Sequence, residues 1–388
     1  MAVSIQKFPP RLDWDRAPWN RWSFQNMREI IPTAEVWRGV GRLREFTEDA
    51  QALDDLSVAS VAGAASTLKA LLDETFTDGF LVLKDGDIVF ERYFNGMSQR
   101  SLHLSQSVAK SFTGAVAGIL AARGILDVAA PVTDYLPELV KTGWKGATLQ
   151  QVLNMTSGVR FSEEYTDPFS DIGQVDVASG WKPIPPGSDA KLKWPAHMFE
   201  LILGLKETVR PHGAGFEYRS IETDVLAFCM ERATGKRLSQ LVSEELWQKM
   251  GAEQNASFTI DSAGYAIADG GLNACLRDYA RFGQLLLSGG DGIIPAAWIE
   301  ATRNGVHNRF SGRLEKVLPQ GAYQNQFWVE DAASRSLLCR GVFGQMIYVS
   351  WQYNMVVVKL SSWPEFVSTE KEVATLQALH KIGQHLSA

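Results

Sequence analysis

Cysteine is scarce in this sequence, with three residues among 388 that lie far apart in the chain. The absence of a C-x-x-C pair argues against both a disulfide framework and a zinc site. The six histidines include no H-E-x-x-H pair, and no serine stands in G-x-S-x-G, so a zinc peptidase and an ordinary α/β-hydrolase are disfavoured. The sequence thus predicts no metal and no organic cofactor. We expect buried thiols at Cys229, Cys275 and Cys339.

Runs of like charge and long apolar runs are also missing. The chain has 38 basic and 44 acidic residues, a net charge of −6, and its basic residues form no cluster. This balance argues against nucleic acid or an anionic membrane as the main partner. The segment from Met1 to Trp22 has charges and prolines throughout, so it predicts neither a secretory signal nor a membrane span, and suggests a cytoplasmic protein. With 45% hydrophobic residues, the chain can bury a substantial core.

A serine and a lysine stand three residues apart in Ser107-Val108-Ala109-Lys110. Residues at this spacing share one face of a helix, so the Lys110 amine can reach the Ser107 hydroxyl. A lysine whose pKa is depressed by burial can serve as base for a serine nucleophile without a histidine. The pattern alone is weak, because S-x-x-K occurs six times, starting at Ser4, Ser66, Ser107, Ser179, Ser188 and Ser368.

Ser107 has a context that the other five serines lack. It follows two apolar stretches joined by Asp85-Gly86, which predict a strand hairpin. It precedes residues 111–120, an uncharged run of small and apolar residues that is typical of a buried helix. The Lys110 amine is then poorly solvated. The alternative for Ser107 is a helix N-cap followed by an incidental lysine.

Strand-like segments lie near both ends of the chain, with helix-like segments between them. Four short apolar segments after residue 322 predict an antiparallel meander, and residues 370–386 predict a helix that covers one of its faces. We expect an α/β (α+β) fold in which an antiparallel sheet, formed from both chain ends and flanked by helices, carries a large all-helical insertion. The expected domains are 1–105 with 300–388, which form the sheet, and 106–299, which is mainly helical and carries the candidate site.

Tyr218 is the candidate for a third member of the site. It precedes an apolar helix, and Ser220 follows two residues later as a hydrogen-bonding partner. A nearby ammonium favours the phenolate form of a tyrosine, which can then relay a proton to a leaving group. A tyrosine at such a place is more often a packing residue, so Tyr218 gains weight only together with Ser107 and Lys110.

Five motifs are spread along the chain: Ser107-x-x-Lys110, Thr148–Leu153 running into Thr156–Gly158, Tyr218-x-Ser220, Gly270–Leu272, and Arg277–Gly283. Together they resemble the serine β-lactamase and penicillin-binding protein superfamily, on its class C β-lactamase and esterase branch. The resemblance spans most of the chain and implies a β-lactamase-like fold. Residues 20–22, 165–181 and 358–364 are most similar to the 6-aminohexanoate-dimer hydrolases, which cleave linear nylon oligomers.

The resemblance implies roles for five residues. Ser107 becomes the acylated nucleophile, Lys110 its base and Tyr218 the general acid and base. The backbone N–H groups of Ser107 and Val342 become the oxyanion hole, with Gly341 beside the substrate.

Two motifs of the superfamily are altered here. Its Y-x-N reads Tyr218-Arg219-Ser220, in which a hydroxyl replaces an amide. Its K-T-G motif is missing. By similarity, the position of that motif in this chain corresponds to residues 339–342 or to residues 343–345. Loss of the K-T-G lysine removes the cation that binds a β-lactam carboxylate, which argues against efficient β-lactamase activity.

Residues 161–194 are rich in Asp, Gly, Pro and Ser and predict a long loop. In the most similar relatives the matching loop folds over the substrate. This implies lid residues at Tyr165 and Trp181, a partner for a substrate ammonium at Asp176, and a pocket-facing side chain at Asp269. Alternatively, Trp181 only packs the loop down and Asp176 is a solvated turn residue.

The expected function is a serine hydrolase that forms an acyl-enzyme with a small-molecule ester or linear amide, of the 6-aminohexanoate-oligomer kind. Alternatives with the same fold are a D-amino-acid peptidase, an acyltransferase and a weak β-lactamase. A non-catalytic ligand-binding relative is the alternative from a different class. Relatives suggest a homodimer, although no residue pattern in the sequence indicates one.

Overall fold

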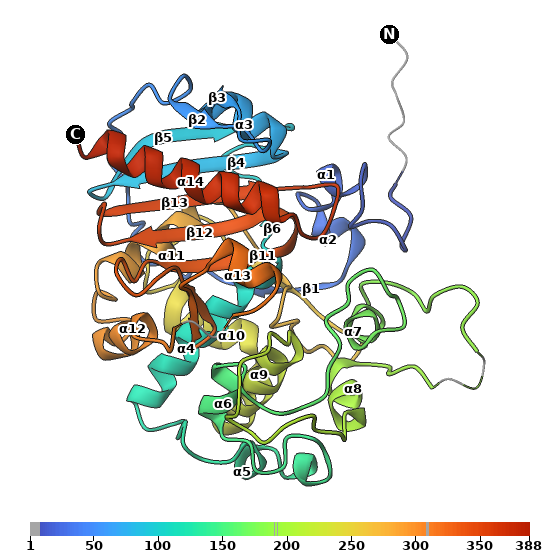
Figure 1. The fold of residues 1–388 in the computed structure, drawn as a ribbon. Coiled ribbons are helices and arrows are strands. Elements are labelled where there is room, and N and C mark those ends of the chain that lie inside the picture. Colours follow the sequence, from blue (N-terminus) through green and yellow to red (C-terminus); the bar gives the residue numbers. More distant parts are fainter. Residues whose placement is uncertain (1–7, 190, 192, 308–309) are drawn as a thin grey trace.

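The central sheet has seven antiparallel strands in the order β5-β4-β13-β12-β11-β10-β9 (Figure 1). A computed structural model describes residues 8–189, 191, 193–307 and 310–388 of the chain. Two strands come from the N-terminal part and five from the C-terminal part, so the sheet assembled from both chain ends is confirmed. The strands are β4 (Thr77–Lys84), β5 (Asp87–Tyr93), β9 (Ala322–Gln324), β10 (Phe327–Val329), β11 (Leu337–Gly341), β12 (Gln345–Ser350) and β13 (Met355–Ser361).

Strands β4 and β5 form the hairpin that Asp85-Gly86 predicts. Both turn residues have positive φ, 54° for Asp85 and 94° for Gly86, as the tight turns of two-residue hairpins require. On its other side β4 pairs with β13, with Phe80 opposite Lys359. This pairing joins the N-terminal hairpin to the C-terminal meander and closes the sheet into one unit.

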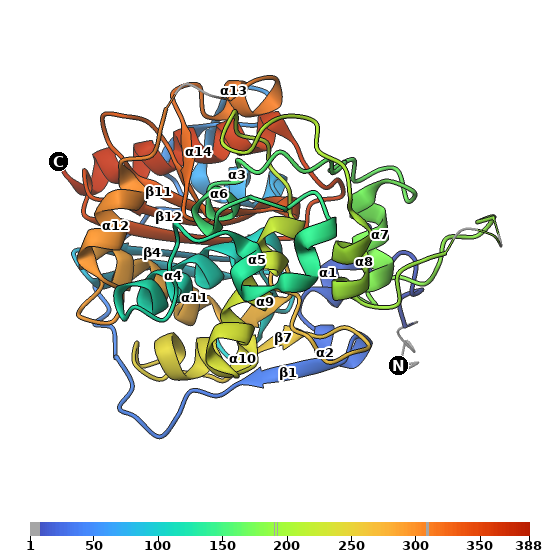
Figure 2. The ribbon, with the colours of Figure 1, turned by 90° about the horizontal axis from the view of Figure 1, so that it is seen from below.

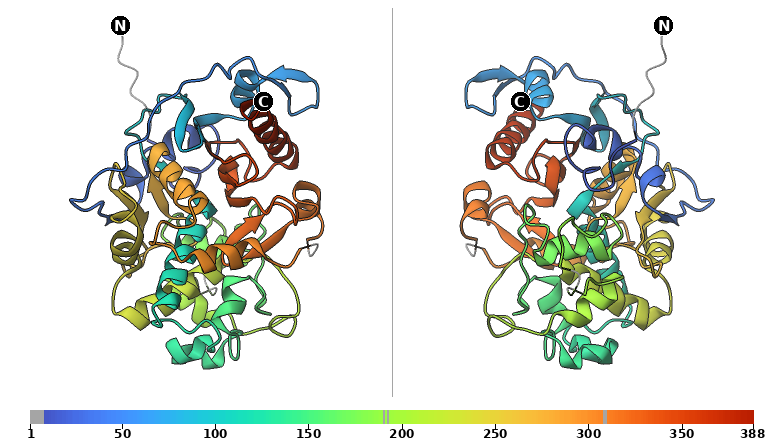
Figure 3. Two further views of the ribbon diagram at one scale, coloured as in Figure 1. Left: turned by 90° about the vertical axis from the view of Figure 1, so that its left-hand side faces the viewer. Right: turned by 90° about the vertical axis from the view of Figure 1, so that its right-hand side faces the viewer.

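Helices cover both faces of the sheet (Figure 3). Alternate residues of a strand point to opposite faces. In β13, Val356 and Val358 enter the core on one side, whereas Met355 and Val357 enter the core on the other. Helices α4 and α11 pack on the first side and α3 and α14 on the second, and α14 confirms the helix predicted near the C-terminus. Their bounds are α3 (Leu68–Glu74), α4 (Ala109–Ala122), α11 (Leu276–Leu287) and α14 (Thr369–Leu386).

The middle of the chain is mostly helical (Figure 2), but it is not all-helical as expected. Strands β7 and β8 pair within it and form a small sheet of order β1-β7-β8-β6. These strands have four and three residues, too few to show a period in the sequence. The division into two domains stays a prediction. The four strands are β1 (Thr33–Val36), β6 (His103–Leu104), β7 (Ala256–Thr259) and β8 (Leu272–Ala274).

Helix α7 (Asp171–Ala178) lies where the sequence predicted only a long loop. Ser170 caps it by accepting a hydrogen bond from the Gly173 N–H at 3.1 Å. Ile172 and Val175, three residues apart, supply a short buried face. The helix is only two turns long, and its Asp and Gly content hid it in the sequence.

Apart from α9, which has 14 residues, the other elements are short. None of the helices in the described ranges is long and apolar enough to cross a membrane. The remaining strands are β2 (Ser57–Ala59) and β3 (Ala65–Thr67). The remaining α-helices are α1 (Asn20–Ser23), α2 (Met27–Ile30), α5 (Val132–Tyr135), α6 (Leu149–Leu153), α8 (Met198–Gly204), α9 (Ile221–Thr234), α10 (Leu238–Val242), α12 (Ala296–Arg303) and α13 (Arg313–Val317).

Two glycines allow helix α4 to lie close to its neighbours. A Cβ at Gly114 would stand 2.4 Å from the carbonyl oxygen of Asn325, and one at Gly118 would stand 2.5 Å from the ring of Trp298. Glycine permits this approach because it has no side chain. The contacts fix α4 against the turn before β10 and against α12. They thereby fix the position of Ser107, whose 3-10 turn directly precedes α4.

We expect Gly114→Ala to lower the free energy of unfolding by about 1–3 kcal/mol, since the Asn325 backbone must move to admit the methyl group. Urea-induced unfolding followed by circular dichroism measures this loss. Gly204→Ala is the matched control, because in the described part of the chain no atom would lie within 4 Å of its Cβ. Equal effects of the two substitutions would contradict the close-packing role of Gly114.

Candidate active site

Ser107 and Lys110 lie at the junction between a 3-10 turn (Gln106–Val108) and helix α4. Gln106 has a φ of +50°, which non-glycine residues rarely adopt and which is often found at functional sites. The turn leaves Ser107 partly exposed, whereas Lys110 is 1% exposed. Lys110 Nζ lies 3.0 Å from Ser107 Oγ. The two side chains that the sequence paired are therefore in hydrogen-bond contact.

Three oxygen atoms surround the Lys110 amine. Nζ donates to Ser107 Oγ at 3.0 Å, to Ser220 Oγ at 3.1 Å and to the carbonyl oxygen of Asp269 at 2.6 Å. An ammonium has three N–H donors, so each has an acceptor here. When one proton is lost, two donors suffice for Ser220 and Asp269, and the lone pair can face Ser107. The arrangement suits proton transfer from Ser107 to Lys110.

The pKa of Lys110 lies above the ordinary value of a lysine, so the depressed pKa expected from the sequence is wrong. Burial lowers the pKa, but the neighbouring acidic groups, which are Tyr218 when ionised and the carboxylates of Asp269 and Glu163, raise it by more. The resting site therefore holds an ammonium. The sequence could not show this, because these groups come from segments far apart in the chain.

Tyr218 lies beside the Ser107–Lys110 pair, just before helix α9. Its ring stacks on Trp328 with centroids 5.3 Å apart, and Lys110 Nζ lies 5.3 Å from the centre of the Tyr218 ring. Burial raises the pKa of Tyr218, and the Lys110 ammonium lowers it by less. The Lys110 ammonium thus favours the phenolate, as expected, but burial outweighs this effect. A protonated tyrosine is the form that can donate a proton to a leaving group.

Glu163 is a member of the site that sequence analysis missed. Its Oε1 accepts hydrogen bonds from Ser220 Oγ and from the Tyr165 hydroxyl at 2.7 Å, and its Oε2 accepts one from the Ser220 N–H at 3.0 Å. Hydrogen bonds thus run from Lys110 through Ser220 and Glu163 to Tyr165. In the sequence, Glu163-Glu164 resembles a solvated loop pair. The one available clue was the small Ser220 in the altered Y-x-N, which leaves room for a neighbour.

Strand β11 ends against the turn that carries Ser107. A Cβ at Gly341 would lie 2.6 Å from the carbonyl oxygen of Ser105 and 3.0 Å from Gln106 Cβ. A side chain at Gly341 would therefore push β11 away. Val342 follows directly, and Ser107 and Val342 line the same two cavities. The N–H groups of these two residues remain the candidates for the oxyanion hole.

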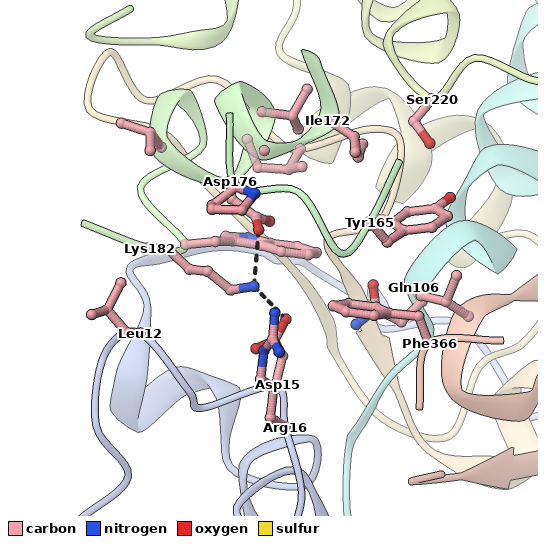
Figure 4. Close-up of a pocket in the computed structure, with 18 of the residues that line it drawn as sticks. Leu12, Asp15, Arg16, Gln106, Tyr165, Ile172, Asp176, Lys182, Ser220 and Phe366 are labelled. Carbon is pink, nitrogen blue, oxygen red and sulfur yellow. Dashed lines mark ion pairs between the residues drawn. The ribbon is translucent and has the colours of Figure 1, made fainter. Parts of the chain in front are cut away.

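A cavity of about 240 Å³ opens beside Ser107 and extends toward α7 (Figure 4). Tyr165 and Phe366 stand near the serine turn, with ring centroids 5.5 Å apart in a stacked arrangement. Gly341 lines a neighbouring cavity of about 300 Å³ instead. The residues that the resemblance placed around the substrate and that line the first cavity are Tyr165, Asp176, Trp181 and Asp269.

Asp176 is neither a free carboxylate nor a solvated turn residue. It pairs with Lys182 at 2.9 Å, and Lys182 pairs with Asp15 at 2.7 Å (Figure 4). Burial raises the pKa of Asp176, and the ammonium of Lys182 opposes this. Two carboxylates therefore share one ammonium at this end of the cavity. Neither Asp15 nor Lys182 was a candidate from the sequence, because only the tertiary structure brings the N-terminal segment here.

Trp181 lines the cavity and also packs the segment of residues 161–194 against the rest of the protein. It therefore combines the two roles that the sequence offered as alternatives. It is 8% exposed and lies against Trp14, with ring centroids 5.5 Å apart. Its Nε1 donates to Thr259 Oγ1 at 3.0 Å. This hydrogen bond connects the segment to β7 and holds one cavity wall in place.

The other S-x-x-K pairs lack the geometry of Ser107 and Lys110. Lys69, Lys182 and Lys371 each form an ion pair with a carboxylate. Ser188 donates to a backbone carbonyl, and Ser4 lies outside the described residues. The three cysteines are buried thiols, as predicted. Within the described ranges, no three or more His, Cys, Asp or Glu side chains are arranged to hold a metal ion.

Comparison with known proteins agrees with this fold. The profile of the Beta-lactamase family matches residues 64–381. A 6-aminohexanoate-dimer hydrolase of Paenarthrobacter ureafaciens is 34% identical over 364 residues, which cover 92% of this chain and 89% of that protein. A Bacillus anthracis structure named as a candidate 6-aminohexanoate-dimer hydrolase superimposes with a TM-score of 0.88 at 32% identity, and covers 98% of this chain and 99% of its own.

More distant structures share the fold alone. A family VIII carboxylesterase superimposes with a TM-score of 0.58 at 16% identity, covering 80% of this chain and 93% of its own. The family profile covers most of the chain, and a hydrolase relative matches it over nearly its whole length. The chain therefore belongs to the Beta-lactamase family and is a serine hydrolase.

Proposed function

We propose that the protein hydrolyses carboxylic esters and linear amides of the 6-aminohexanoate-oligomer type through an acyl-enzyme on Ser107. The observation that carries this proposal is the 3.0 Å contact between Ser107 Oγ and Lys110 Nζ at the edge of a cavity. The 34% identity to a 6-aminohexanoate-dimer hydrolase supports the substrate class. Esters place the smaller demand on the site, because their leaving groups depart more readily than amines.

Acylation begins when Ser107 Oγ attacks the substrate carbonyl carbon and its proton passes to Lys110 Nζ. The N–H groups of Ser107 and Val342 stabilise the negative oxygen that develops. Tyr218 then gives its proton to the leaving alcohol or amine, and the Lys110 ammonium replaces that proton. The bond to the leaving group breaks, and the acyl group stays on Ser107.

Deacylation reverses these proton transfers with water as the nucleophile. Tyr218 accepts a proton from the attacking water while its own proton passes to Lys110, and Lys110 then returns a proton to Ser107 Oγ as the carboxylic acid leaves. Lys110 has to be a neutral amine before the first attack, and its raised pKa opposes this. A substrate that displaces water from the cavity leaves less polar surroundings near the Lys110 ammonium, which lowers its pKa.

The acyl part of the substrate is assigned to the cavity that contains Asp176. Asp13, Asp15, Asp176, Lys182 and Arg16 line this cavity, and their formal charges sum to an excess of one negative charge. Such a site favours an acyl chain with a terminal ammonium. This supports 6-aminohexanoyl groups over plain alkanoyl groups.

We expect intact-protein mass spectrometry to detect an acyl group on Ser107 within seconds of adding p-nitrophenyl butyrate. Ser107→Ala should show no adduct, and Lys110→Ala should acylate about a thousandfold more slowly because the base is lost. Peptide mapping locates the adduct. An adduct on another residue, or unchanged hydrolysis by Ser107→Ala, would refute the mechanism. A complete absence of adduct and of nitrophenol would favour a ligand-binding protein.

Glu163→Gln should shift the acid limb of the pH profile of kcat/KM to lower pH by about one unit. The negative charge of Glu163 raises the pKa of Lys110, so a neutral amide lets Lys110 become a free amine at lower pH. Glutamine still offers an oxygen to Ser220 and Tyr165. Glu164→Gln is the matched control, since Glu164 is exposed and binds Thr166. A shift toward higher pH in Glu163→Gln would contradict this charge coupling.

Asp176→Asn should reduce kcat/KM for the p-nitrophenyl ester of 6-aminohexanoate by about tenfold and leave the hexanoate ester nearly unchanged. The physical reason is the loss of the uncompensated negative charge at the end of the cavity. Steady-state kinetics at low ionic strength gives both values. Equal losses for the two esters would mean that Asp176 only supports the fold of the lid.

A further inference from the structure

A second cavity meets the first at the nucleophile. Ser107, Tyr165 and Val342 line both cavities, and the remaining walls differ. Tyr218 lines the second cavity and is not part of the wall of the first. Because Tyr218 is the proposed proton donor to the leaving group, the leaving group departs into the second cavity. That assignment rests on the proposed function.

Two arginines and one glutamate form the outer part of the second cavity. Arg313 Nη1 lies 2.6 Å from Glu372 Oε2, and Arg340 Nη2 lies 2.8 Å from Glu372 Oε1. Arg313 comes from α13, Arg340 from β11 and Glu372 from α14, and all three line the cavity. Two positive charges therefore face one negative charge. The cluster keeps one uncompensated positive charge.

Arg340 is an unusual residue for the middle of a sheet. It is 7% exposed, and its guanidinium lies 4.7 Å from the centre of the Trp328 ring. Among the residues that the structure describes, its Nε and Nη1 have no hydrogen-bond acceptor. Buried donors without acceptors are costly. Their retention beside a cavity indicates an anionic partner from outside the chain.

The other acids of this cavity do not cancel the charge of the cluster. Glu163 is linked through Ser220 to the Lys110 ammonium, at the opposite end of the cavity. Glu164 is exposed and accepts hydrogen bonds from Thr166. The two cavities thus have opposite excess charge at their outer ends, negative beside Asp176 and positive beside Arg313.

We propose that Arg313 and Arg340 form a carboxylate subsite for the leaving group, with Glu372 holding both guanidinium groups in place. Arginine is suited to this because its N–H groups match the two oxygens of a carboxylate. Arg313 is partly exposed, and Arg340, whose Nε and Nη1 have no acceptor among the described residues, lines the same cavity against Trp328. The enzyme then prefers substrates whose leaving alcohol or amine ends in a carboxylate.

The test compares the butyryl ester of 6-hydroxyhexanoate with that of 6-hydroxyhexanamide, which is neutral and nearly isosteric. In the unmodified protein kcat/KM should be about tenfold higher for the anionic ester at low ionic strength, and salt should reduce the difference. Arg313→Gln and Arg340→Gln should remove the preference. Arg123→Gln is the control, since Arg123 pairs with Glu245 at the same 2.6 Å far from the cavity.

A second readout separates this proposal from the hydrolase mechanism. Titration calorimetry measures binding of free 6-hydroxyhexanoate and of its amide to Ser107→Ala, which needs no turnover. The subsite is supported if the carboxylate binds more tightly than the amide and if Arg313→Gln removes this difference. This holds even if Ser107 is never acylated. Equal binding of the two compounds to Ser107→Ala overturns the subsite proposal. So does an unchanged preference for the carboxylate in Arg313→Gln, provided that this variant unfolds at the same temperature as the unmodified protein.

Discussion

The buried ammonium of Lys110 is the interaction on which the rest of the site depends. Its three acceptors come from the turn before α4, from the start of α9 and from the segment before β8. A charge that is 1% exposed is tolerable only when each of its donors is satisfied. The ammonium therefore holds together three segments that are remote in the sequence. The same contact that stabilises the charge places a potential base against Ser107.

Charge is distributed asymmetrically around this centre. On one side three carboxylates, of Asp13, Asp15 and Asp176, line a cavity together with Lys182 and Arg16. On the other side Arg313 and Arg340 share Glu372. Each arrangement leaves a single unpaired charge at a cavity end, and the two signs are opposite. A linear substrate with an ammonium at one end and a carboxylate at the other matches this polarity. The fold thus orients such a substrate by electrostatics, and aromatic walls at Tyr165, Phe366 and Trp328 shield it from water.

Glu163 connects this chemistry to the wall of the first cavity. The carboxylate binds Ser220, which binds Lys110, and it also binds the Tyr165 hydroxyl. Movement of Tyr165 would therefore alter the hydrogen bonding of Glu163 and, through it, the pKa of Lys110. Ser220, which stands where the Y-x-N motif has an amide, is the residue that binds Glu163 here.

The sequence by itself determined the sheet built from both chain ends, the Asp85-Gly86 hairpin and the helix at the C-terminus, because local turn chemistry and apolar periodicity encode them. It also paired Ser107 with Lys110, since their contact spans only one helical turn. Only the tertiary structure decided the protonation of Lys110, the roles of Glu163, Asp15 and Lys182, and the two arginines that share Glu372. The protonation state and these roles depend on burial and on charged groups that come together from remote segments. No local pattern in the sequence predicts burial or such contacts.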